Sequence, residues 1–194
     1  GAIAYAWQNY DFDRVIPFLG GPVTAKGDSD GHTLAGSFEA FYDLSTRVEV
    51  TPGLRFGPLA TLTAITGELE GFTETEAGIL DLTVLGTDSD QVVSGLGLWF
   101  GFDRVFGSTE MALEGRLAWE RTFGDRSNTT LSAIPIAGAT FATPSALVAR
   151  DRLALGLGAV FTIGDNATAE LRYDGSFASS ESDHSGSAGV TIRF

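Results

Sequence analysis

Apolar and polar side chains alternate with a period of two along most of the chain. Near the C-terminus, Ala188, Val190, Ile192 and Phe194 share one parity, and a serine, a glycine, a threonine and an arginine alternate with them from position 187 to 193. Successive side chains of a β-strand point to opposite faces, so this pattern predicts strands. Helical spacing of apolar residues is absent, and we therefore expect an all-β protein. About ten strands are predicted, at 2–16, 33–44, 47–65, 75–86, 91–105, 109–123, 129–140, 150–163, 167–179 and 184–194.

The alternation fits two architectures that differ in which face is apolar. A β-sandwich turns its apolar faces inward, whereas a transmembrane β-barrel turns them to lipid and keeps a polar interior. The predicted segments run for about 10–16 residues, longer than the roughly 5–6 of a typical soluble strand. About 9–11 residues suffice to cross a bilayer. The pattern therefore favours an antiparallel, up-and-down transmembrane β-barrel, with a soluble β-sandwich binding module as the alternative.

Composition excludes several other classes. The chain has 194 residues, no cysteine and a net charge of −13, from 25 acidic against 12 basic residues. This acidity argues against a nucleic-acid partner, because neutralising phosphates needs a basic face. Absence of cysteine excludes disulfides and thiolate metal sites, and 43% hydrophobic residues exclude a disordered chain. The length allows one domain of ordinary size.

The predicted connections fall into two groups when the chain is followed back from its last strand. On the side of the C-terminus the turns are short, at 44–46, 86–90, 124–128 and 164–166. On the opposite side they are mostly longer, at 17–32, 66–75, 140–149 and 180–183. The connection at 105–108 is an exception, because it is short and falls on the long side. Such asymmetry is typical of outer-membrane barrels.

Few residues suggest catalysis or metal binding. The stretch GDSDG at 27–31 fits G-x-S-x-G, but a nucleophile elbow needs a strand before it and a helix after it. We expect a surface loop there instead, and its aspartates lack the glutamate that completes a calcium loop. The two histidines, His32 and His184, fall on the predicted outer side, where one could serve a hydrolase with a distant partner. We expect no catalytic residue, no metal site and no cofactor.

Charged side chains recur on the polar parity of the predicted strands. In a barrel this parity faces the lumen, where charges of both signs pair across strands and keep the passage wet. The residues predicted to line the pore are Glu39, Glu49, Arg55, Asp81, Glu114, Arg116, Glu120, Glu170, Arg172, Asp174 and Arg193.

A series of motifs resembles the C-terminal β-domain, or translocator, of autotransporters (type V secretion). AWERTFGD at 118–125 is similar to that family's tryptophan-containing strand and its following turn. LGLGAVFTIGDNATAELRYDG at 155–175 resembles the penultimate hairpin, and HSGSAGVTIRF at 184–194 the closing strand. Further matches in the family's order are YAWQNYDFDR at 5–14, VTPGLRF at 50–56, GFTETEAG at 71–78, SGLGLWF at 94–100 and FATPSALVARDR at 141–152.

The resemblance implies a bacterial outer-membrane anchor that supports export of an N-terminal passenger and is not an enzyme. It implies contacts with outer-membrane lipid and lipopolysaccharide, with the barrel-assembly machinery and with the chain's own passenger segment. The assembly signal would lie in the last strand, at Val190, Ile192 and the terminal Phe194. The charges that line the lumen would contact the passenger during translocation.

The family's domain has twelve strands and a helix in the pore, whereas this sequence predicts about ten strands and no helix. Residues 1–194 are therefore expected to form one outer-membrane β-barrel domain that lacks its first strands and its passenger, or else a barrel closed with ten strands. Another possibility is a stand-alone small outer-membrane barrel with binding or hydrolase activity in its outer loops.

Overall fold

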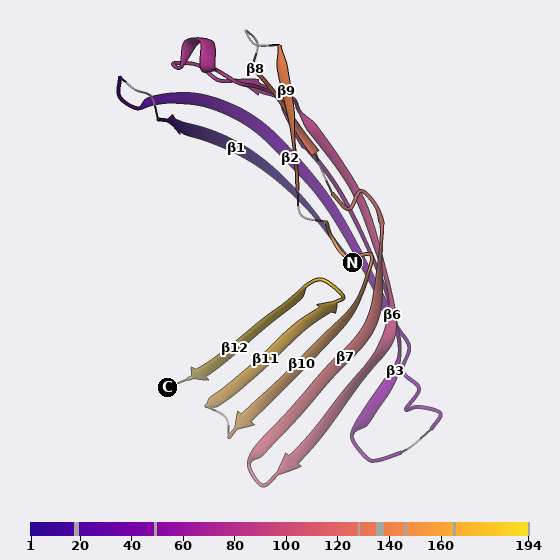
Figure 1. Ribbon diagram of the computed structural model, residues 1–194. Coiled ribbons are helices and arrows are strands. Elements are labelled where there is room, and N and C mark those ends of the chain that lie inside the picture. Colours follow the sequence, from indigo (N-terminus) through magenta and orange to yellow (C-terminus); the bar gives the residue numbers. More distant parts are fainter. Residues whose placement is uncertain are drawn as a thin grey trace. The chain divides into compact units, whose positions relative to one another are not determined.

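The computed structural model describes residues 1–17, 20–48, 50–127, 129–134, 138–145, 147–164 and 166–193. Within these ranges the chain forms twelve strands and one short 3-10 helix (Figure 1). No helix in the described residues is long and apolar enough to span a membrane. The elements are β1 (Ala2–Ile16), β2 (Val23–Phe41), β3 (Leu54–Leu69), β4 (Phe72–Thr73), η1 (Gly78–Leu80), β5 (Thr83–Val84), β6 (Thr87–Phe106), β7 (Thr109–Gly124), β8 (Thr129–Ile134), β9 (Ala139–Pro144), β10 (Asp151–Ile163), β11 (Ala167–Ala178) and β12 (Ser182–Ile192).

The predicted all-β, antiparallel fold is confirmed. The strands form two sheets, a larger one with the order β1-β2-β3-β6-β7-β10-β11-β12 and a smaller one with the order β4-β5-β8-β9. The sequence prediction agrees to within two residues for β1, β7, β10 and β11, and β12 begins two residues earlier than expected. These strands have the most regular alternation, so local pattern and tertiary pairing select the same conformation.

The strand predicted at 75–86 is wrong. Two-residue strands, β4 and β5, flank the helix η1 there. The backbone takes a left-handed conformation at Glu76 (φ 74°) and again at Gly78 (φ 63°), which an extended strand cannot contain. The strand predicted at 129–140 is likewise two strands, β8 and β9, paired as an antiparallel hairpin. A left-handed residue, Gly138 (φ 59°), precedes the second of them.

The loop predicted at 17–32 is also wrong for most of its length. Strand β2 begins at Val23, and its register pairs Val23 with Ile16 and Gly27 with Phe12 of β1. Two glycines of β2, Gly27 and Gly31, have close neighbours where a side chain would be. A Cβ on Gly27 would collide with the ring of Phe72. A loop-like composition thus reflects a strand that other side chains cover closely.

These corrections change where the connections fall. Strands β7, β10, β11 and β12 pair antiparallel, so the connections along them alternate between the two ends of the strands. In the second unit, the connections 42–53, 107–108 and 164–166 lie at the end where β12 finishes, and 179–181 lies at the other. Because the turn 107–108 joins β6 to β7, β6 starts and β7 finishes away from that first end. The expected sides of 86–90 and 124–128 were therefore wrong. So was the side of 105–108, and the exception it posed disappears.

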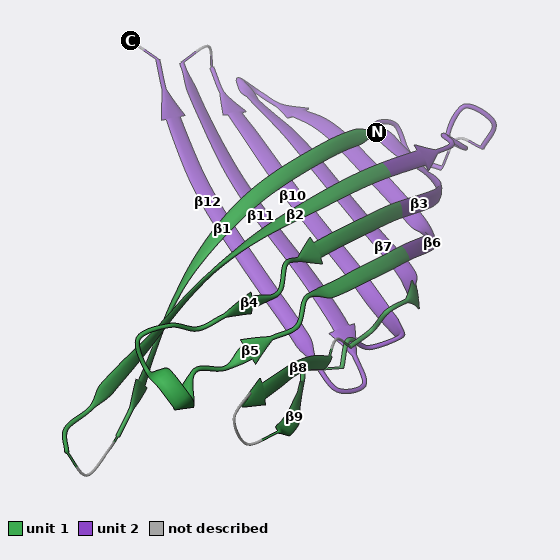
Figure 2. Ribbon diagram, turned by 90° about the horizontal axis from the view of Figure 1, so that it is seen from above, with its two compact units in different colours: residues 1–37, 63–92, 123–148 green, residues 38–62, 93–122, 149–194 purple. Residues whose placement is uncertain are grey.

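Two compact units make up the chain (Figure 2). The first comprises 1–37, 63–92 and 123–148, and the second 38–62, 93–122 and 149–194. The first unit contains β1, most of β2 and the smaller sheet. The second contains most of β7 and all of β10, β11 and β12, whose pairings are known residue by residue.

The buried interior is small. Among the described residues, only Ala25, Leu59, Ala118 and Ala149 are buried hydrophobic positions. Large apolar side chains lie exposed instead, including Leu171 at 54% and Val190 at 73%. Soluble domains bury most of their large aliphatic residues. This distribution is the opposite of what a soluble β-sandwich requires.

Candidate functional site

Alternation gives the strands of the second unit two chemically different faces. Pairing places Leu157 of β10 beside Tyr173 of β11, and Ala159 beside Leu113 of β7 and Leu171 of β11. The opposite parity is rich in glycine and charge. We call this second face, rich in glycine and charge, the charged face. Its charged residues are Glu39, Arg55, Asp103, Glu114, Arg116, Glu120, Arg152, Glu170, Arg172 and Asp174.

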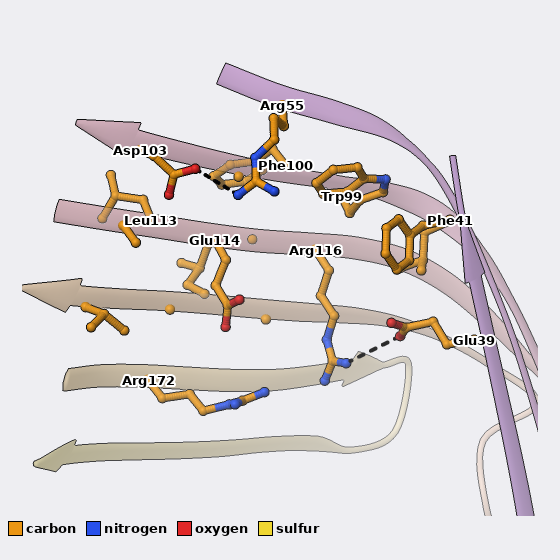
Figure 3. A pocket seen from close by; sticks show the side chains of 18 residues that line it. Glu39, Phe41, Arg55, Trp99, Phe100, Asp103, Leu113, Glu114, Arg116 and Arg172 are labelled. Carbon is orange, nitrogen blue, oxygen red and sulfur yellow. Dashed lines mark hydrogen bonds and ion pairs between the residues drawn. The ribbon is translucent and has the colours of Figure 1, made fainter. Parts of the chain in front are cut away.

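The charged face is held by ion pairs that cross strands. Arg116 donates from Nη2 to Oδ1 of Asp174 at 3.1 Å. Its Nη1 lies 4.0 Å from Oε2 of Glu39, the pair that Figure 3 marks. Arg172 pairs with Asp174 along the same strand, β11, with 3.1 Å between Nε and Oδ2. All these side chains are at least one-third exposed. Each pair is therefore worth only about 0.2–1 kcal/mol, and its main effect is to balance charge on a hydrated wall.

Two further ion pairs extend this face. Arg55 of β3 donates from Nη2 to Oδ2 of Asp103 at 2.8 Å. Arg152 donates from Nε to Oε2 of Glu120 at 2.6 Å. Neither Asp103 nor Arg152 was predicted as a site residue. Both share the parity of neighbouring glycines on their own strands, so the same alternation argument would have found them.

A cavity of about 420 Å³ lies over the charged face (Figure 3). Arg55, Arg116 and Arg172 line it together with Trp99, whose ring meets Phe41 edge-on at 5.1 Å between centroids. The indole Nε1–H of Trp99 is buried and has no hydrogen-bond partner among the described residues. The cavity is therefore lined by both charged and aromatic side chains.

Most of the predicted pore-lining residues lie on this face, but Asp81 and Arg193 lie outside its strands. Asp81 follows η1, outside any strand, where its carboxylate accepts the N–H of Ala77 at 2.9 Å. Its predicted place depended on a strand at 75–86 that the chain does not form. Arg193 lies just past β12, with its N–H bonded to the carbonyl of Asn166. Glu49 lies outside the described residues.

The predicted assembly signal lies at the end of the chain. Val190 and Ile192 are on the apolar parity of β12 and are 73% and 62% exposed. Val190 pairs with Ala169 of β11, and Ile192 with Ala167. Phe194 lies outside the described residues.

The residues that resembled catalytic groups have other roles. Ser29, within GDSDG, is buried in β2 and donates its hydroxyl to the carbonyl of Glu70 at 2.6 Å. His32 lies 3.6 Å from a carboxylate oxygen of Glu68, and Nδ1 of His184 lies 2.8 Å from the hydroxyl of Tyr173. A strand runs through the motif and no helix follows it, so it is not a nucleophile elbow. The described ranges contain no group of three His, Cys, Asp or Glu that could hold a metal ion.

Outside the charged face, the sequence prediction missed an ion pair whose carboxylate is buried. Arg14 of β1 donates from Nε to Oε1 of Glu74 at 2.8 Å and from Nη2 to its other oxygen. Glu74 is only 6% exposed, and it also accepts the N–H of Leu82. The Arg14 guanidinium holds the pKa of Glu74 below its ordinary value, and burial opposes this effect. Sixty residues separate the partners, so no local pattern could indicate the pair.

Comparison with known proteins adds one match. The profile of the family described as "Autotransporter beta-domain" matches residues 1–174. None of the curated proteins compared with the chain matches it.

Proposed function

The chain belongs to the autotransporter beta-domain family, and we propose that it supports export of an N-terminal passenger segment to the cell surface. Domains of this family are translocators embedded in the bacterial outer membrane. The observation that carries the proposal is the division of the second unit into an exposed apolar face and a charged face. A translocator needs both, one for lipid and one for a polar passage.

The apolar face suits contact with outer-membrane lipid and lipopolysaccharide. Leu157, Leu171 and Val190 are between 42% and 73% exposed, on three neighbouring strands. In water this area would be a strong drive to aggregate. In a bilayer the same side chains need no cover, and the strand ladder satisfies the backbone polar groups that lipid cannot.

The charged face suits passage of a polypeptide. Acidic and basic side chains are interspersed on this face. A moving segment therefore meets paired charges and water, and no region of strongly positive or strongly negative potential holds it. A wall of this kind can contact the passenger weakly at many points. The predicted lumen residues, including Glu39, Arg55 and Arg116, are proposed to make these contacts.

Assembly is proposed to depend on the last strand. Val190 and Ile192 present a row of exposed apolar side chains that the barrel-assembly machinery could read together with the terminal Phe194. This role needs no chemistry, and we assign the chain no enzymatic activity. Its partners would be lipid, the assembly machinery and its own passenger.

Export can be tested by fusing a protease-sensitive reporter to the N-terminal side of the full-length protein. Intact cells are treated with an external protease, and cleavage of the reporter is followed by immunoblot. Both the fusion and a control reporter without the β-domain carry the same signal peptide for export to the periplasm. We expect the external protease to cleave the reporter in the fusion and to leave the control reporter intact. A reporter that stays protected while the β-domain sits in the outer membrane would contradict the proposal.

A further inference from the structure

A glycine of β10 lies beneath the side chain of Arg116. Gly156 is directly opposite Arg116 on β7 and directly opposite Asp174 on β11. A Cβ placed on Gly156 would lie 2.7 Å from Nε and 2.9 Å from Cγ of Arg116. These separations are shorter than packed atoms allow, so the arginine occupies the space that a side chain on Gly156 would take.

The reach of Arg116 requires this arrangement. Neighbouring strands lie about 4.8 Å apart, so the backbones of β7 and β11 are roughly 10 Å apart. The guanidinium nevertheless comes within 3.1 Å of the Asp174 carboxylate. An arginine that stood upright on the sheet could not make this contact. Arg116 therefore lies along the sheet, across the bare backbone of Gly156.

The next row of the sheet repeats the device with the charges exchanged. Gly158 lies opposite Glu114 on β7 and opposite Arg172 on β11. A Cβ on Gly158 would lie 2.7 Å from Cγ and 2.8 Å from Oε1 of Glu114. Glu114 thus also crosses a glycine in the direction of a side chain of opposite charge.

A third case lies on β6, where a Cβ on Gly101 would come 3.3 Å from Nη2 of Arg55. None of the three glycines has a positive φ, so backbone conformation does not require glycine at these positions. Glycine inside a strand weakens it. Space for the neighbouring charged side chain is the reason that remains.

We propose that Gly101, Gly156 and Gly158 are positioning residues, which let Arg55, Arg116 and Glu114 lie flat and so keep the charged face clear for a translocating segment. The inference rests on the proposed function, because it assumes that this face lines the passage. Larger residues at these three positions would force the charged side chains to stand upright on the sheet, and the passage would become narrower.

The test measures single-channel conductance of the full chain reconstituted in planar bilayers. Gly156→Ala removes the space beside Arg116, and we expect a lower conductance than wild type. Gly189→Ala is the matched control, since Gly189 shares this face, opposite Glu170, and a Cβ there meets no atom within 4 Å. Adding Arg116→Ala to Gly156→Ala removes the upright side chain, and we expect the conductance to return.

Each outcome separates the two ideas. Conductance of Gly156→Ala equal to wild type, or a loss that Arg116→Ala does not restore, would overturn the inference while leaving the translocator intact. A wild-type chain that forms no channel would contradict both. Gly156→Ala is used only if it keeps the heat-modifiable gel mobility of a folded barrel. If it loses this mobility, Gly158→Ala and the double variant Gly158→Ala with Glu114→Ala take its place in the same comparison. We expect a lower conductance for the single variant and a restored conductance for the double variant.

Discussion

Glu74 fastens the connection between β3 and β6 to strand β1. Its carboxylate takes two hydrogen bonds from Arg14, and Arg14 also donates to the carbonyl of Leu80 at 2.8 Å. Two further hydrogen bonds join Glu74 to Leu82. Leu82 donates its N–H to the Glu74 carboxylate, and Glu74 donates its own N–H to the Leu82 carbonyl. One carboxylate thus ties this connection to β1, beside the backbone hydrogen bonds between Thr75 and Lys26 of β2.

Glu74→Gln is expected to loosen this connection. The amide cannot balance the Arg14 charge, and breaking a fully buried pair costs about 3–5 kcal/mol. Arg14 is 37% exposed, so we expect a smaller local cost of about 2 kcal/mol. Chymotrypsin, which cleaves after Phe72 and Leu80, should cut the variant sooner than wild type. Glu76→Gln is the control, since Glu76 is 56% exposed in its pair with Lys26; equal cleavage of the two variants would refute the role of Glu74.

The same contact should respond to pH in a defined direction. Arg14 lowers the pKa of Glu74 in the folded chain. The stabilisation is therefore fully present above the ordinary glutamate pKa of about 4.3 and is lost as pH falls through the lowered folded value. An acid-active protease such as pepsin should cut within 70–86 increasingly as the pH falls below 4. Glu74→Gln should lack this pH dependence, and a wild-type profile that matches the variant's would exclude the linkage.

At the scale of elements, the sequence predicts strands well where alternation is regular and poorly where other forces act. Strand β1 matches its predicted range of 2–16. Strand β2 begins ten residues before its predicted start at 33. The ring of Phe72 fills the space beside Gly27, so this position needs a glycine, and glycine is a residue typical of loops. The segment 75–86 alternates like a strand, but the left-handed backbone of Glu76 is not visible in any local pattern.

The corrected topology predicts which turns share a side of the membrane. Thr109 pairs with Ile163, and Gly164 donates its N–H to the carbonyl of Ser108, so the turns at 107–108 and 164–166 lie together. The pairing of Phe177 with Ser182 places the turn at 179–181 at the opposite end. Following the predicted strands back from the last one had placed 105–108 at that opposite end, because the single strand predicted at 129–140 does not form.

Single cysteines can check this arrangement, because the chain has none of its own. In intact cells, a membrane-impermeant maleimide should label Ser180→Cys. It should leave Ser108→Cys and Asn166→Cys unlabelled until the outer membrane is opened. Labelling of Ser108→Cys together with Ser180→Cys would contradict the topology.

At the scale of the whole molecule, the alternation of apolar and polar residues carries most of what the sequence could reveal of the site. It identified Glu39, Arg55, Glu114, Arg116 and Arg172, which line one cavity. It could not assign Asp81, since parity has meaning only inside a strand. The contacts between distant segments, such as Arg14 with Glu74, depend on how the sheet folds, and no spacing in the sequence records them.

The central claim is that the two faces meet different solvents, and adjacent residues of β11 test it most directly. Leu171 lies on the apolar parity and Glu170 on the charged face. The measurement is spin-label accessibility by electron paramagnetic resonance, at Leu171→Cys and Glu170→Cys in the full chain in bilayers. We predict that oxygen, which concentrates in lipid, relaxes the label at 171, and that a water-soluble nickel chelate relaxes the label at 170. Equal accessibility at both positions, or a chain that is monodisperse in water with position 171 shielded from both agents, would contradict the account.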